Sequence, residues 1–198
     1  MRLTKYTHAC VRLEHEGRVL VVDPGTWSEP AALSGADAVL ITHEHADHVD
    51  HLRLAGLGVP VYAPAGAHLD GPAPVRVSSG TEFTAAGFHV RAVGGRHATV
   101  HGGLPDCVNL GCIIDEAVYH PGDALHVPTH PVETLLVPVH ASWLKTTEAV
   151  DFVKAVAPGR CFAIHDAQLN DRGLRAVDGW LTKEAGHGYR RLDPGESV

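Results

Sequence analysis

AVLITHEHADH, residues 38–48, sets a short apolar run directly before four side chains that commonly bind metal ions. The first four residues have the length and composition of a buried β-strand. His43, His45, Asp47 and His48 follow within six residues, and on a regular strand His43 and His45 would share one face. Neutral imidazoles and a carboxylate are ligands that suit Zn²⁺, Mn²⁺ or Fe²⁺. The alternative is a solvated loop in which Asp47 caps the next helix, but this spacing directly after a buried strand favours a metal site.

Three further candidate ligands also follow the ends of predicted strands, namely His97, Asp123 and His165. Polar residues after strand ends gather at one edge of a sheet, so ligands from both halves of the chain are expected to meet in one cleft. Each has an alternative. His101 is a rival of His97, Asp123 is also suited to a turn after Pro-Gly, and His165 to the start of a helix.

Four more polar residues are candidates for supporting roles. Asp23 ends a buried strand. Its carboxylate either orients a ligand histidine through the second ring nitrogen or forms a turn before Pro24-Gly25. His8, His120 and His140 are candidates for lining the pocket. His140 follows a further buried strand, from which it would bind substrate or donate a proton to a leaving group.

Strands and helices alternate along both halves of the chain. Apolar runs bounded by Gly, Pro and Asp predict strands, and apolar residues at helical spacing predict helices. This order indicates an α/β (or α+β) fold in which helices cover sheets, as a single domain over residues 1–198. The expected strands are 1–6, 10–15, 18–23, 38–41, 60–63, 80–94 with a turn at Gly87, 107–115, 117–120, 134–138 and 160–164, and the expected helices are 49–55, 146–156 and 171–181.

The composition is that of an ordinary globular protein, with 44% of the 198 residues hydrophobic and 20% charged. The formal net charge is −7 and no run is rich in Lys or Arg, so a nucleic-acid partner is not expected. No apolar run approaches the length of a membrane span, and no secretory signal opens the sequence. The cysteines form no CxxC pair. We therefore expect a cytoplasmic protein with reduced thiols and a small-molecule substrate.

The sequence resembles the metallo-β-lactamase superfamily. The resemblance rests on Thr-His-x-His-x-Asp-His at 42–48, on Gly-Asp at 122–123 and on the late histidine His165, in the expected order over nearly the whole chain. Within the superfamily, residues 6–10 (YTHAC) and 22–24 (VDP) resemble the branch that includes ascorbate-6-phosphate lactonase, with threonine where that branch usually has glycine.

The resemblance implies a four-layer αββα sandwich that binds two divalent transition metal ions, first of all Zn²⁺, with Mn²⁺ or Fe²⁺ as alternatives. In the hydrolase mechanism that such ions support, Asp47 is expected to help orient the attacking water. Carried over residue by residue, the resemblance assigns His43, His45 and His97 to the first metal, Asp47, His48 and His165 to the second, and Asp123 to a bridge between them.

These features predict a metal-dependent hydrolase that uses a metal-bound hydroxide on a small ester, lactone, amide or phosphodiester. Catalytic roles are expected for Asp47 and His140. One alternative is a nuclease or phosphodiesterase of the same superfamily, although the acidic net charge counts against it. The other is a catalytically inert metal-binding or sensing protein. No GxSxG elbow or Walker glycine loop supports serine-hydrolase or P-loop chemistry.

Overall fold

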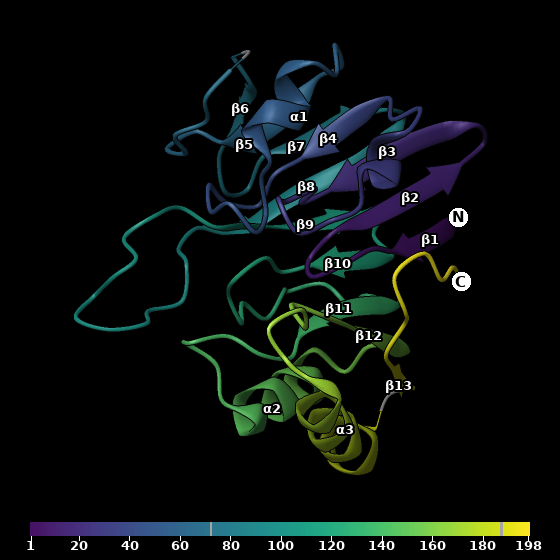
Figure 1. The fold of residues 1–198 in the computed structure, drawn as a ribbon, viewed down its shortest axis with the longest axis vertical. Helices are drawn as coiled ribbons and strands as arrows, with labels where there is room; N and C mark the ends of the chain where they lie inside the picture. The colour runs from purple at the N-terminus through teal and green to yellow at the C-terminus, as the bar shows by residue number, and fades with distance from the viewer. Residues whose placement is uncertain (72, 187) are drawn as a thin grey trace.

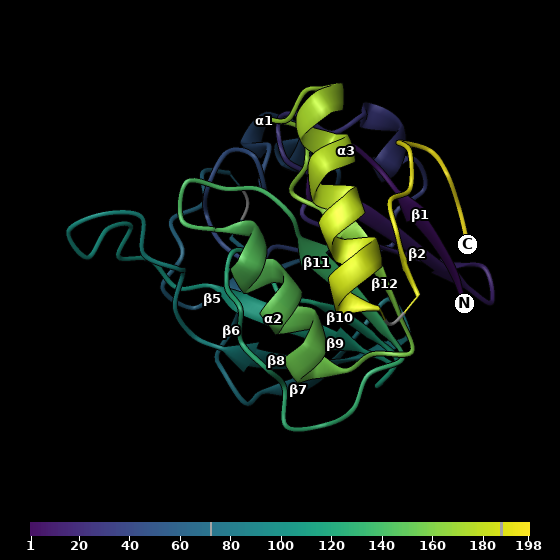
Figure 2. The same cartoon turned by 90° about the horizontal axis from the view of Figure 1, so that it is seen from below.

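Two β-sheets lie face to face between helices in the computed structural model, which describes residues 1–71, 73–186 and 188–198. In Figure 1, α1 (His51–Ala55) lies outside one sheet, and α2 (Thr146–Val156) and α3 (Asp171–Trp180) lie outside the other. Figure 2 shows α2 and α3 side by side across the face of their sheet. The predicted four-layer α/β architecture is therefore confirmed. Among the described residues, no helix combines the length and apolar character needed to cross a membrane.

The first sheet has six strands in the order β1-β2-β3-β4-β5-β6. The first two pairings are antiparallel and the others are parallel. The end of the chain closes on β1, because Leu3 and Val198 exchange two backbone hydrogen bonds of 2.9 Å. The strands are β1 (Arg2–Lys5), β2 (Val11–His15), β3 (Arg18–Val22), β4 (Ala38–Leu40), β5 (Val61–Pro64) and β6 (Val75–Val77).

The second sheet has seven strands in the order β13-β12-β11-β10-β9-β8-β7. The strands from β10 to β13 are parallel, and those from β7 to β10 are antiparallel. The segment between β8 and β9 projects from the body of the molecule in both views (Figures 1 and 2). The strands are β7 (Glu82–Ala85), β8 (Phe88–Gly94), β9 (Leu110–Ile114), β10 (Val118–His120), β11 (Thr134–Pro138), β12 (Arg160–Ile164) and β13 (Tyr189–Arg190).

Continuous apolar strands build the layers, because successive side chains point to opposite faces of a sheet. In β3, Leu20 enters the core between the two sheets, and Val21 enters the core beneath α1. In β11, Leu136 enters the core between the sheets, and Leu135 packs in the core that contains Phe152 of α2. Each sheet thus packs apolar side chains on both of its faces, and the polar residues of the candidate site follow the strand ends.

Most predicted elements match the observed ones to within two residues, but three differences matter. The strand expected from residue 107 begins only at Leu110. The helix expected from residue 49 begins at His51, because the Asp50 carboxylate caps it by accepting hydrogen bonds from the backbone of Leu52 and Arg53. The short strands β6 and β13 were not predicted, since two or three residues carry too little apolar pattern.

A close backbone contact at Gly25 generates a stability prediction. A Cβ atom on Gly25 would lie 1.9 Å from the carbonyl oxygen of Asp47, whereas one on Gly56, after α1, would meet nothing within 4 Å. We expect Gly25→Ala to lower the free energy of unfolding by about 1–3 kcal/mol, the usual range for overpacking. Gly56→Ala should change it by less than about 0.5 kcal/mol. Urea denaturation measures both, and equal midpoints for the two variants would contradict the prediction.

Candidate metal centre

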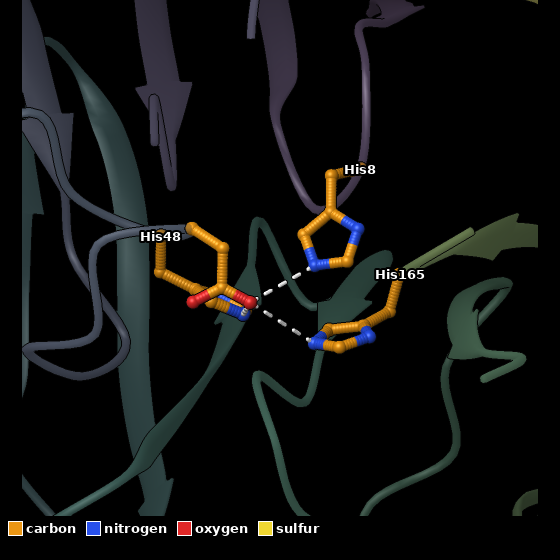
Figure 3. Close-up of side chains that lie close together, drawn as sticks. His8, His48 and His165 are labelled. Atoms are coloured by element: carbon orange, nitrogen blue, oxygen red, sulfur yellow. Dashed lines mark hydrogen bonds and ion pairs between the residues drawn. The ribbon is translucent and has the colours of Figure 1, made fainter. Parts of the chain in front are cut away.

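The histidine and aspartate side chains of both halves meet at the ends of the strands. Three groups of side chains have potential ligand atoms within 4.8 Å of one another. Figure 3 shows His8, His48 and His165, which come from three separate segments and face one another. The groups are His43, His45 and His97; His8, Asp47, His48 and His165; and His43, His48 and Asp123.

The first group joins the end of β4 to the segment after β8. Nε2 of His43 and Nδ1 of His45 face each other at 3.1 Å. The ring of His97 lies 4.9 Å from that of His43 and 4.7 Å from that of His45, measured between centroids. Three ring nitrogens therefore surround one point, as a metal ion with three imidazole ligands requires.

The second group gathers around the Asp47 carboxylate. Its Oδ2 atom lies 3.1 Å from His8 Nε2, 3.6 Å from His165 Nε2 and 3.9 Å from His48 Nε2. The contacts to His8 and His165 are the dashed lines in Figure 3. One carboxylate with imidazoles around it is a second possible metal position.

Asp123 lies between these two groups. Its Oδ1 atom is 3.1 Å from His48 Nε2, and its Oδ2 atom is 3.1 Å from His165 Nε2 and 3.4 Å from His97 Nε2. The indole Nε1 of Trp143 donates a hydrogen bond of 3.1 Å to Oδ2. A single carboxylate that faces both groups has the position a bridging ligand needs.

Hydrogen bonds orient the histidine rings with one polarity. Nδ1 of His48 donates to the Asp23 carboxylate, Nδ1 of His97 to the carbonyl of Ala98, and Nδ1 of His165 to the carbonyl of His140. Nδ1 of His43 lies 3.1 Å from the Thr42 hydroxyl, whose own proton goes to Asp23. In its neutral form, each of these four rings therefore has its lone pair on Nε2, toward the cleft. Outer partners of this kind are typical of metal-binding histidines.

The described structure leaves several of these inward atoms without a hydrogen-bond partner. They are His48 Nε2, His97 Nε2, His165 Nε2 and Asp123 Oδ1, all buried. Buried polar atoms are normally hydrogen-bonded, so a cluster of unpartnered ones needs an explanation. Lone pairs of neutral imidazoles and a carboxylate that converge on shared points fit divalent metal ions.

The buried Asp23 carboxylate ties the histidine loop to the sheet. Its Oδ1 accepts a 2.8 Å hydrogen bond from the backbone N–H of Thr42, and its Oδ2 accepts one of 2.7 Å each from the Thr42 hydroxyl and His48 Nδ1. Because Asp23 takes the Thr42 N–H, no neighbouring strand extends β4 to the histidines. β4 ends at Leu40, so His43 and His45 lie beyond the strand and the side-chain alternation of a regular strand does not apply to them. A turn from His45 to Val49 brings the rings together instead.

Burial and charge act together on the titratable groups. Burial lowers the pKa of His43 well below its usual value, which keeps this ring neutral. Burial also lowers the pKa of His48, but Asp123 and Asp23 outweigh it and raise that pKa well above its usual value. Burial opposes ionisation of Asp123, yet the imidazoles, led by His48, hold its pKa well below the usual range. The carboxylates thus make the centre of the cluster attractive to positive charge.

The structure brings together all seven residues that the resemblance assigned as ligands. Their role as ligands stays a prediction. His101, the rival of His97, is exposed in the projecting segment and belongs to none of the three groups. His120 lies behind the site, where Nε2 donates to the carbonyl of Ala9 and Nδ1 accepts from the N–H of Gly122. His140 contributes its backbone carbonyl to His165, and its side chain is half-buried.

Three supporting residues had not been identified from the sequence. Thr42 and Trp143 contact the cluster as described above, and the Asn109 side chain holds the Asp123 loop by accepting from the N–H of Asp123 and donating to the carbonyl of Pro121. Thr42 stands next to the motif and offered a local signal. Asn109 and Trp143 reach the site only through folding, so no spacing rule indicates them.

Comparison with known proteins identifies the superfamily to which the chain belongs. A family model described as the β-lactamase superfamily domain matches residues 2–165. Protein Rv0786c of Mycobacterium tuberculosis is 40% identical over 179 residues, which cover 84% of each chain. A UPF0173 metal-dependent hydrolase of Methylobacterium nodulans is 30% identical over 173 residues, covering 70% of this chain and 72% of the relative. The chain belongs to the metallo-β-lactamase superfamily.

Solved structures share the fold at low sequence identity. Igni18, a metallo hydrolase from Ignicoccus hospitalis, has a TM-score of 0.76 at 20% identity and covers 100% of this chain and 97% of its own. CmlA, a diiron β-hydroxylase from Streptomyces venezuelae, has a TM-score of 0.77 at 19% identity, and the match covers 53% of its chain. Together the comparisons support the coarser prediction of a metal-dependent hydrolase of this superfamily. They do not confirm the resemblance to the ascorbate-6-phosphate lactonase branch.

The Asp23 contacts predict a loss of metal affinity when the carboxylate becomes an amide. The Asp23 carboxylate accepts hydrogen bonds from three donors. In Asp23→Asn, the NH₂ group replaces one carboxylate oxygen and must face at least one of these donors, which then loses its acceptor. The orientation of His48 should suffer, and Zn²⁺ affinity should fall about 10–100-fold, as for other partners of metal-binding histidines. Competition with a chromophoric chelator measures this affinity.

The matched control for Asp23→Asn is Asp37→Asn. Asp37 also accepts a backbone hydrogen bond in the first sheet, from the N–H of Val19, but lies outside the metal groups. It should leave Zn²⁺ affinity unchanged. Equal affinities for both variants would show that Asp23 has no part in metal binding.

Proposed function

We propose that the protein is a dinuclear metal-dependent hydrolase acting on a small ester, lactone, amide or phosphodiester. The observation that carries the proposal is the convergence of unpartnered imidazole nitrogens of His48, His97 and His165 on the carboxylate of Asp123. His43, His45 and His97 would hold one ion, Asp47, His48 and His165 the other, and Asp123 would bridge them.

The donor set suits Zn²⁺ first, with Mn²⁺ or Fe²⁺ as alternatives, because imidazole and carboxylate ligands accept all three. CmlA, a diiron enzyme that shares the fold, supports keeping iron among these alternatives. Such ions, when bound, supply Lewis acidity toward a substrate oxygen and lower the pKa of a coordinated water.

Asp47 is the member of the second group that reaches solvent. Its side chain is 20% exposed, compared with 0% for His8 and His48 and 4% for His165. Burial opposes ionisation of Asp47, but the hydrogen bond from His8 and the nearby imidazoles lower its pKa to about 2. An ionised carboxylate at the mouth of the site would orient a water through its oxygen atoms. The proposed role of His140 as a proton donor requires its half-buried side chain to reach the leaving group.

A depression beside the first group offers room for the rest of a small substrate. It has a volume of about 540 Å³ and adjoins His45 and Cys107. Val100, Leu104 and Pro105 of the projecting segment form its apolar side. Its lining, drawn from the described residues, includes no Lys or Arg. This favours a neutral ester, lactone or amide with an apolar group, and it disfavours the alternative of a nuclease, which needs cations for phosphates.

An inert metal-binding or sensing protein remains the alternative from another class. It shares the ligand set but predicts no turnover in a metal-loaded preparation. A cytoplasmic location, a single domain over residues 1–198 and a small-molecule partner stay predictions.

Asp123→Asn tests the bridge. The amide keeps the size of the side chain and suits the turn after Pro121-Gly122, but it lacks the charge that would hold two cations close together. We expect metal content to fall from about two ions per chain toward one. We also expect hydrolysis of a lactone or ester panel to fall by more than about 100-fold, beyond the range for outer partners. Elemental analysis and steady-state kinetics measure the two effects.

His101→Asn is the control for Asp123→Asn, because His101 is exposed and lies outside the metal groups. It should keep full metal content. Full metal occupancy and activity in Asp123→Asn would remove the bridge from the proposal, and a metal-replete wild-type protein inert on the whole panel would favour the sensing alternative.

A further inference from the structure

His8 occupies an unusual position in the second group. It lies in the loop between β1 and β2 with a φ angle of 67°, and its side chain is fully buried. Its ring centroid is 3.9 Å from that of His165, and Nε2 is 3.1 Å from Asp47 Oδ2 (Figure 3). Distance alone would admit His8 as a further metal ligand.

The second ring nitrogen shows which atom of His8 carries the proton. The backbone N–H of Ala167 donates a 3.3 Å hydrogen bond to His8 Nδ1. A neutral imidazole has one donor and one acceptor nitrogen. Because Nδ1 accepts, the proton is on Nε2, which points at the Asp47 carboxylate. His8 thus presents an N–H to the cleft, where a ligand would present a lone pair.

The other rings of the cluster have the opposite polarity. Their Nδ1 atoms face protein oxygens, so in the neutral form of each ring the lone pair of Nε2 points toward the cleft. The rings concerned are those of His43, His48, His97 and His165.

The loop that carries His8 is anchored on several sides. The N–H of Thr7 donates to the Glu29 carboxylate at 2.9 Å, and the Thr7 hydroxyl donates to the same group. The carbonyl of His8 accepts a 3.1 Å hydrogen bond from the N–H of His165. Trp27 packs edge-on against the His8 ring at a centroid distance of 4.6 Å. A non-glycine residue at positive φ costs energy that such contacts must offset, so this conformation delivers the ring to one place.

We propose that His8 is a positioning residue that donates its Nε2 proton to Asp47 Oδ2 and is not a metal ligand. The hydrogen bond holds the carboxylate in the orientation in which it faces the second group. The inference rests on the proposed function only in taking Asp47 as a ligand of that group. A charge-assisted hydrogen bond to a carboxylate ligand is the kind of contact that tunes metal affinity.

The protonation pattern can be tested on the wild-type protein without metal. Two-bond ¹H–¹⁵N correlation spectra distinguish imidazoles protonated on Nε2 from those protonated on Nδ1. The His8 signal, identified by its loss in His8→Gln, should show the Nε2–H form. An Nδ1–H form for His8 would overturn the proposal.

Two variants of His8 separate donation from ligation. Phe keeps a ring but has no N–H, whereas Gln offers an amide N–H near the position of Nε2. Both place a side chain at the same positive φ, so backbone strain is matched. His15→Phe, at the exposed end of β2, is the control for loss of a histidine elsewhere. Chelator competition gives Co²⁺ affinity, and the visible absorption of bound Co²⁺ reports its ligand set.

Of the two Co²⁺ ions, we expect His8→Phe to bind the one of lower affinity about 10–100-fold less tightly than wild type does. The visible absorption bands at saturation should be unchanged. His8→Gln should recover most of the affinity, and His15→Phe should match wild type. Unchanged Co²⁺ affinity in His8→Phe would overturn the proposal. Altered absorption bands in both His8 variants would also overturn it, because they would show that His8 is a metal ligand. Wild-type protein that binds no Co²⁺ would instead refute the proposed function.

Discussion

The buried carboxylate of Asp23 is the interaction on which the rest of the site depends. It stands at the end of β3 with a φ angle of 50° and accepts hydrogen bonds from the N–H and hydroxyl of Thr42 and from His48 Nδ1. A buried charge is stable only when it is fully hydrogen-bonded. These three donors exist together only when β3, β4 and the histidine loop are all in place. The first sheet and the arrangement of the site are therefore coupled through this residue.

The same logic extends around the cluster. Protein oxygens hold the outer nitrogens of four rings, so their inner nitrogens reach the cleft with lone pairs already aimed. Asp123 stands between the two groups, with Trp143 on one oxygen and with Asn109 holding its backbone. Because the sheets and loops fix these directions in advance, little ordering remains when ions or substrate bind. His8 differs from these four rings, because in the proposed arrangement its Nε2 directs an N–H toward the cleft.

The sheets hold the metal groups, whereas a projecting loop lines the adjoining depression, so one fold can present different surfaces to different substrates. The metal groups lie at the ends of strands in sheets that pack apolar side chains on both faces. A solved structure that is only 20% identical in sequence shares this fold. The projecting segment between β8 and β9 is attached to the site near its two ends, through His97 and Ala98 at one end and Cys107 and Asn109 at the other. Its apolar side chains line the depression beside His45 without holding up the core. Such a loop is free to vary in sequence while the metal groups stay in place.

The sequence by itself determined most of the strands, the main helices, the superfamily and the seven candidate ligands that converge, because these depend on local patterns and motifs. Apolar runs require two-sided burial, and the spacing of His43, His45, Asp47 and His48 is dense enough to be read without a structure. Only the tertiary structure decided how these groups are oriented. For three rings the partner of Nδ1 comes from elsewhere in the chain, namely Asp23 for His48, the His140 carbonyl for His165, and Ala167 for His8. Whether a histidine offers a lone pair or a proton depends on that partner, and residues distant in sequence meet only when both sheets have folded.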